Sequence, residues 1–118
     1  MTSFEILKAA RQLLSAPGAW TTGMYAKSCT GFPVQADSKI ASCWCTLGAV
    51  YKVSDSLPTE HDPDVDDAID RLLTSLSDHS RQYFLEGEIG DWNDAPGRNQ
   101  SDVLALFDKA IAAAESRQ

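Results

Sequence analysis

Four segments of this chain repeat apolar residues at the spacing of an α-helix, and this periodicity constrains the fold more than any other feature. The first segment begins with Thr2 and Glu5, the pattern of a capping box, and Pro17-Gly18 ends it. The third begins with Asp62 as N-cap and Pro63 at the first helical position, and the acids that follow are stabilised by the helix dipole. The apolar faces of these two segments are Phe4, Ile6, Leu7, Ala10, Leu13 and Leu14, and Val65, Ile69, Leu72, Leu73 and Leu76.

The second and fourth segments have start signals of the same kind. Asp37 or Ser38 can cap a second helix, and Asn99, with Asp102 three residues on, can cap the fourth. The face of the second would carry Ile40, Trp44, Leu47, Gly48 and Tyr51, and that of the fourth Val103, Leu104, Phe107, Ala110, Ile111 and Ala114.

The segment from Trp20 to Val34 has no helical pattern. Gly31 suits a turn position with positive φ, and Pro33 confines its strand to the edge of a sheet. The prediction is therefore a mostly α, four-helix domain with a short β-hairpin between the first and second helices, spanning residues 1–118 as a single unit.

The composition of the chain argues against nucleic acids and membranes as partners. The chain has 118 residues and a formal net charge of −7, which argues against sequence-independent binding of DNA, because such binding requires cationic side chains to replace counterions. No apolar run reaches the length of a membrane span, and no basic, apolar leader opens the chain. A cytoplasmic protein with no nucleic-acid or membrane partner is expected.

The segment Trp92-Asn93-Asp94-Ala95-Pro96-Gly97-Arg98 is the strongest candidate for a functional site. Pro96-Gly97 predicts a turn with Gly97 at positive φ, and a carboxylate, Asp94 or Asp91, is expected to hold Arg98. The segment is either a structural turn anchored by Trp92 or a ligand site. In a ligand site, Trp92 would stack on a planar group while Arg98 and the next helix N-terminus hold an anion.

Residues 82–90 have little helical pattern and a glycine on each side of Ile89, which predicts an irregular segment packed by its aromatic side chains. It would form one wall of a pocket beside the 92–98 turn. The candidate binding residues are therefore Trp92, Asn93, Asp94, Arg98 and Tyr83.

The residue types that usually carry catalysis or metals form no complete set. On a helix, Cys43 and Cys45 would point about 200° apart, so they could neither chelate one ion nor form a disulfide, and both are expected to be buried as small hydrophobic residues. Cys29, His61 and His79 have no matching spacing. No metal, cofactor or catalytic residue is assigned.

Two blocks together resemble a known family. Trp44-Cys45-Thr46-Leu47-Gly48-Ala49, after the Gly31-Phe32-Pro33-Val34 turn, and Trp92–Arg98, leading into Val103 and Leu104, resemble small bacterial and phage proteins grouped as domain of unknown function 6197. The resemblance implies a compact stand-alone unit, sometimes carried by phages, and it supplies no activity or cofactor.

The expected function is that of a small non-catalytic binding protein, a phage or mobile-element inhibitor or accessory factor that acts on a host protein. The alternative is a receptor or sequestering protein for a small anionic ligand such as a nucleotide, recognised by Trp92 and Arg98. A third reading, a small hydrolase with Asp94 or Asp91 as the base, is open because catalytic groups can converge from distant positions. The sequence leaves the oligomeric state open.

Overall fold

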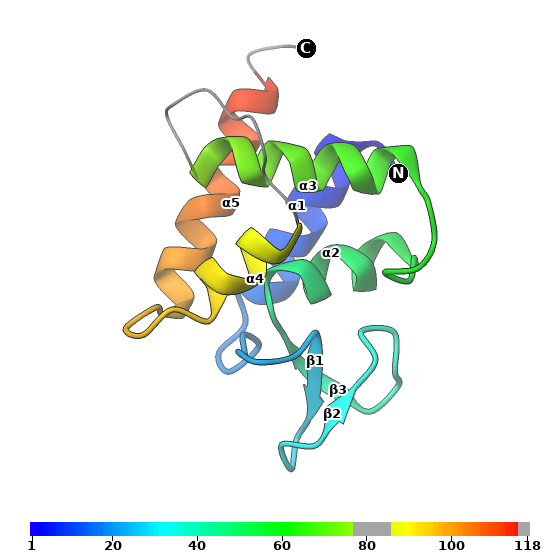
Figure 1. Ribbon diagram of the computed structural model, residues 1–118, viewed down its shortest axis with the longest axis vertical. Coiled ribbons are helices and arrows are strands. Elements are labelled where there is room, and N and C mark those ends of the chain that lie inside the picture. The colour runs from blue at the N-terminus through cyan, green and yellow to red at the C-terminus, as the bar shows by residue number, and fades with distance from the viewer. Residues whose placement is uncertain (77–85, 116–118) are drawn as a thin grey trace.

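The computed structural model describes residues 1–76 and 86–115 and shows a mostly helical domain with a small sheet (Figure 1). Its elements are, in chain order, α1 (Ser3–Leu14), β1 (Ala26–Ser28), β2 (Pro33–Val34), β3 (Ala41–Trp44), α2 (Thr46–Ser54), α3 (Pro63–Leu76), α4 (Glu86–Asn93) and α5 (Gln100–Glu115). The predicted fold class is confirmed: α1, α2, α3 and α5 are the main helices, and the strands lie between α1 and α2 in sequence.

Three of the four predicted helix starts are confirmed in detail. The Thr2 hydroxyl accepts a bond from the Glu5 amide, and the Glu5 carboxylate accepts one from the Thr2 amide, which lowers the pKa of Glu5. The Asp62 carboxylate accepts from the amide of Asp64 at the start of α3. The same reciprocal pair as at α1 forms between Asn99 and Asp102 at the start of α5. Each pair satisfies backbone amides that the first helical turn leaves without partners.

The prediction for the second helix is wrong at its N-terminal end. Residues Ala41–Trp44 form strand β3, and α2 begins at Thr46 with Cys45 as its N-cap. Ile40, expected on the buried face, is 64% exposed. The apolar spacing that suggested one helix combines a strand residue, Trp44, with residues of α2. The Trp44 backbone pairs instead with β1 and with Ala19, and this pairing overrides the local pattern.

The predicted hairpin is present as β1 and β2, but a third strand, β3, pairs with the other edge of β1, and this was not predicted. All pairs are antiparallel, in the order β2-β1-β3. Gly31 has φ +89° in the turn, and Pro33 lies in the edge strand β2, both as predicted. Figure 1 shows the sheet at one end of the molecule, next to α2 and away from α3.

The prediction of an irregular segment is wrong for its second half, because residues 86–93 form α4. Ile89 is completely buried in the core, and packing of this side chain holds a helix that has little amphipathic pattern of its own. The first half, which includes Tyr83, lies outside the described residues.

The helices α1, α2, α3 and α5 pack on one another around a single apolar core, and α4 packs on α2 and α3. The completely buried large side chains of this core come from all five helices and include Leu7, Val50, Leu72, Ile89 and Phe107. In the described part of the chain, no helix is both long and apolar enough to cross a membrane.

Candidate binding site between α4 and the sheet

The 92–98 segment is a compact turn that joins the end of α4 to the start of α5. The Arg98 amide donates to the Ala95 carbonyl at 3.0 Å, and Gly97 has φ +83°, as Pro96-Gly97 predicted. The Arg98 side chain folds back over the turn: its Nε donates to the Trp92 carbonyl at 2.8 Å, and its guanidinium carbon lies 4.1 Å from the centre of the Trp92 ring. Trp92 itself packs against the core.

The predicted carboxylate partner of Arg98 is wrong. The nearest ion pair joins its NH1 nitrogen to Asp102 at 3.8 Å, and no described ion pair joins it to Asp94 or Asp91. The reason is geometric, because the turn directs the side chain back across Trp92 and along the first turn of α5. With 24% of its side chain exposed, Arg98 is largely used within the turn.

Replacing Arg98 by lysine should lower the free energy of unfolding by about 1–2 kcal/mol, because lysine keeps the charge but loses the planar contact with Trp92 and the Nε bond to its carbonyl. Urea unfolding followed by circular dichroism measures the loss. Arg11→Lys is the matched control, since Arg11 forms an exposed pair with Asp108, and it should change stability by less than about 1 kcal/mol. Equal losses in the two variants would contradict the structural role of Arg98.

Asn93 is the centre of a buried hydrogen-bond network. Its side chain is completely buried, and its Oδ1 accepts from the Trp20 indole at 2.8 Å, the Thr46 amide at 3.0 Å and the Thr46 hydroxyl at 2.7 Å. Its Nδ2 donates to the Thr21 carbonyl at 3.1 Å and to Asp94 Oδ1 at 2.9 Å. The network therefore ties the end of α4 to the start of α2 and to the loop before β1.

Asp94 extends this network to the loop. Its Oδ1 also accepts from the Gly23 amide at 2.9 Å, so the two adjacent residues Asn93 and Asp94 fix the loop at Trp20, Thr21 and Gly23. The buried part of the network, at Asn93 and Thr46, specifies one arrangement of the chain, because an alternative would leave these buried polar groups unpaired.

The two sequence blocks thus meet in space. Thr46, from the block at 44–49, bonds directly to Asn93, from the block at 92–98. Within the first block, the Trp44 indole donates to the Ala36 carbonyl at 2.9 Å, and Gly48 lies against the Tyr25 backbone so closely that a Cβ there would lie 2.7 Å from the Tyr25 carbonyl carbon. The block at 44–49 therefore holds the chain at Tyr25 and Ala36, and the block at 92–98 holds the loop from Trp20 to Gly23.

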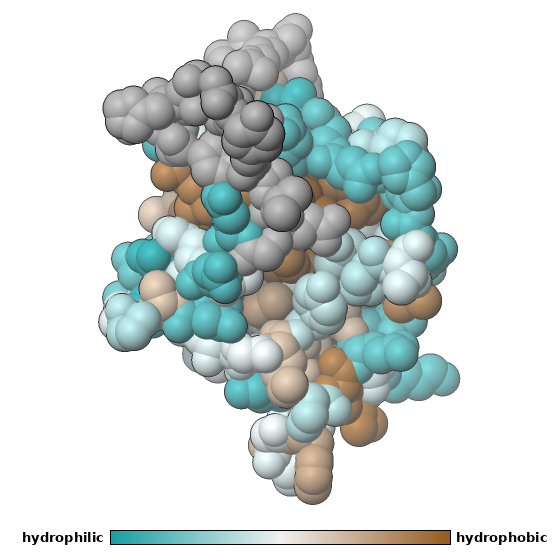
Figure 2. All heavy atoms as spheres, viewed as in Figure 1, coloured by the Kyte–Doolittle hydropathy of each residue, from teal (hydrophilic) through white to brown (hydrophobic). Residues whose placement is uncertain are grey.

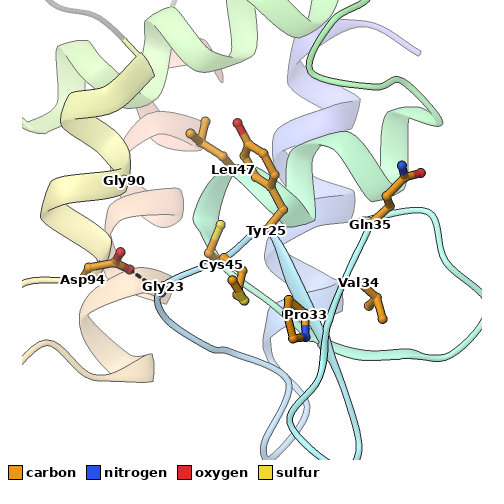
Figure 3. Close-up of a pocket in the computed structure, with 10 residues that line it drawn as sticks. Gly23, Tyr25, Pro33, Val34, Gln35, Cys45, Leu47, Gly90 and Asp94 are labelled. Atoms are coloured by element: carbon orange, nitrogen blue, oxygen red, sulfur yellow. Dashed lines mark hydrogen bonds between the residues drawn. The ribbon is translucent and has the colours of Figure 1, made fainter.

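An open groove of about 650 Å³ lies beside this junction. Its lining is mostly apolar and consists of Gly23, Met24, Tyr25, Pro33, Val34, Gln35, Cys45, Leu47, Gly90 and Asp94. Figure 3 shows Asp94 on the α4 side and Pro33 and Val34 on the sheet side, with Cys45 and Tyr25 between them. Figure 2 shows apolar residues at the surface between α4 and the sheet. A volume of this size is typical of a ligand or side-chain binding site.

Cys45 lines the groove, but its side chain has a structural role as the N-cap of α2. Its Sγ accepts from the Gly48 amide at 3.3 Å and so caps α2, and burial raises the pKa of the thiol. The thiol therefore stays protonated near neutral pH, where it is a weak nucleophile. Cys43 lies on β3 and is half-buried, so the helical geometry assumed for this pair is wrong, while the burial predicted for Cys45 is found. No group of three potential metal ligands occurs in the described residues.

The structure brings four of the five predicted site residues together, namely Trp92, Asn93, Asp94 and Arg98, and Tyr83 lies outside the described residues. Of these four, only Asp94 lines the groove. The sequence did not point to the groove residues Met24, Tyr25, Val34 and Leu47. They come from three chain segments that meet only in the folded protein, and no spacing in the sequence relates these segments.

The fold and this junction define a small, mostly helical domain in which two sequence blocks, 44–49 and 92–98, hold a three-stranded sheet against the helices. The chain matches the family of unknown function DUF6197 over residues 1–113 and belongs to this family. No curated protein and no solved structure matches the chain.

Proposed function

We propose that this protein is a small non-catalytic binding protein that recognises another protein through the groove between α4 and the sheet. The observation that supports this most is the groove itself, an open and mostly apolar depression next to partly exposed Met24 and Tyr25. The Asn93 network and the capped α2 hold its walls in place, and a preformed apolar site of this kind is what a binding protein requires.

By binding in this way, the protein would act as an inhibitor or accessory factor of a host protein, as expected of a phage or mobile-element protein. A cytoplasmic location agrees with three free cysteines, since thiols stay reduced there. Cys45 supports a non-catalytic role, because its thiol is used as a helix cap and its pKa is raised.

A receptor for a small anionic ligand has less support. Arg98, which would hold the anion, is already bonded to the Trp92 carbonyl and covers the face of the Trp92 ring that a planar ligand would need. The groove also contains a carboxylate, Asp94, which would repel an anion. Native mass spectrometry of the purified protein tests this alternative, because a co-purified nucleotide would appear as extra mass that disappears on denaturation.

Met24→Glu should abolish partner binding while leaving the fold intact. Met24 is 37% exposed and lines the groove, so a carboxylate is tolerated in the free protein but would be desolvated under an apolar partner group. Affinity capture from a lysate of the organism that encodes the protein, quantified by mass spectrometry, measures which proteins each variant retains.

Ile40→Glu provides the matched control, since Ile40 is 64% exposed and does not line the groove. Proteins retained by the wild type and by Ile40→Glu, but lost at least about tenfold from Met24→Glu, would support the proposal. Identical protein profiles for all three would contradict recognition through the groove.

A further inference from the structure

Asp94 is the one charged side chain in the groove lining, within the described part of the chain. It is exposed and follows the last residue of α4 directly. The groove therefore combines an apolar surface with a single carboxylate at one side (Figure 3).

Among the described residues, only one oxygen of this carboxylate accepts a hydrogen bond. Oδ1 accepts from the Gly23 amide and from Asn93 Nδ2, whereas Oδ2 has no hydrogen-bond partner among the described residues. No described lysine, arginine or histidine forms an ion pair with Asp94 either. A carboxylate oxygen thus remains available to a bound group.

The surroundings make this position more negative. The C-terminal end of a helix carries the negative end of its dipole, and an acid there is less favourable than a base. Glu88 and Asp91, both exposed on α4, add further negative charge, and α4 has no basic residue in its last turn. Arg98 offsets part of this field, because its guanidinium bonds to the Trp92 carbonyl in the last turn of α4, but its described ion pair is with Asp102 and not with Asp94. A carboxylate without a described ion pair, beside other acids, attracts a cation.

We propose that the groove binds a segment of the partner protein in which an apolar side chain lies next to a lysine or arginine. The apolar side chain occupies the space lined by Tyr25, Val34 and Leu47, and the cationic group pairs with Asp94 Oδ2. This inference rests on the proposed function, and it adds the chemistry that selects the partner. The net charge of −7 favours the approach of a basic segment in addition.

The test uses a library of random short peptides displayed on phage and selected on the immobilised full-length protein. The enriched sequences should contain apolar residues next to lysine or arginine. A synthetic peptide of the consensus sequence, labelled for fluorescence anisotropy, should bind Asp94→Asn about five- to tenfold more weakly than the wild type, as expected for a lost charge-assisted bond. The amide oxygen of asparagine can still accept from Gly23 and Asn93, so the fold is retained, which circular dichroism checks.

Asp91→Asn is the matched control, because it removes the same charge from an exposed residue outside the groove. The Asp91→Asn variant should bind the peptide less than about twofold more weakly than the wild type does. In the wild type, affinity should also fall as salt is raised, which tests the ion pair without any substitution.

Two other outcomes separate this inference from the proposed function. Apolar peptides without a basic preference, bound equally by Asp94→Asn but not by Met24→Glu, would overturn the ion pair and keep the groove as the binding site. Peptides that bind Met24→Glu and Asp94→Asn as well as the wild type would overturn both.

Discussion

Asn93→Ala should lower the free energy of unfolding by about 3–5 kcal/mol, which is a large part of the stability of a domain of this size. The substitution removes the acceptor of three donors, the Trp20 indole and the amide and hydroxyl of Thr46, and the donor to the Thr21 carbonyl. Each buried polar group left without a partner is destabilising by about 1–3 kcal/mol, and the losses are not fully additive. Urea unfolding followed by tryptophan fluorescence and circular dichroism measures the effect.

Asn99→Ala is the matched control for this experiment. Asn99 also uses its side chain to cap a backbone amide, that of Asp102, but it is exposed and makes no long-range bond among the described contacts. Asn99→Ala should lower the free energy of unfolding by about 1 kcal/mol, the usual value for the loss of an N-cap. If both variants lost the same stability, the buried network would contribute no more than a surface cap. The prediction would then be wrong.

The parts of the fold that the sequence predicts well are those decided by residues close in the chain. The capping pairs at Thr2, Asp62 and Asn99 depend on atoms within three residues of one another, and all three form as predicted. The turn at Pro96-Gly97 is local in the same sense, because the proline ring and the glycine φ decide it.

The errors arise where pairing between distant segments decides the structure. Residues 41–44 have an apolar spacing that fits a helix, yet the Trp44 backbone bonds to Ala19, and β3 pairs with β1. Residues 86–93 lack a helical pattern, yet burial of Ile89 makes them a helix. Local propensity is worth a few tenths of a kcal/mol per residue, which tertiary packing readily exceeds.

The candidate site shows the same limit. The sequence indicates the importance of 92–98 and of Asn93 and Asp94, and it predicts a pocket beside this turn, where Gly90 and Asp94 line the groove. It assigns Arg98 to the wrong carboxylate, however, and it does not assign the groove residues on the sheet side. The partners of Asn93, namely Trp20, Thr21 and Thr46, lie 47 to 73 residues away along the chain, and no spacing rule relates them. The family resemblance pairs the two blocks correctly, and the structure supplies the reason, a direct contact between Thr46 and Asn93.

Gly48→Ala should be the most damaging single-methyl substitution at this junction, with a loss of about 3 kcal/mol or more in the free energy of unfolding. The added Cβ would lie 2.7 Å from the Tyr25 carbonyl carbon and closer still to its oxygen, and backbone atoms cannot rotate away as a side chain can. The Tyr25 carbonyl also accepts from the Cys45 amide at 3.1 Å, so moving it breaks the junction between β1 and the start of α2. Because Tyr25 and Cys45 both line the groove, the variant should also lose affinity for the selected peptide.

Gly90→Ala distinguishes this steric effect from a general cost of changing a helical glycine. Gly90 also lies in a helix and lines the groove, but a Cβ there meets nothing within 4 Å, and its φ is not positive. Alanine is favoured over glycine in a helix by about 1 kcal/mol, so Gly90→Ala should keep or raise the melting temperature. Thermal and urea unfolding of both variants measure the contrast. A Gly48→Ala protein as stable as Gly90→Ala would show that the Tyr25 backbone, directly before β1, does not press on α2 at Gly48. The groove would then not depend on this contact for its shape.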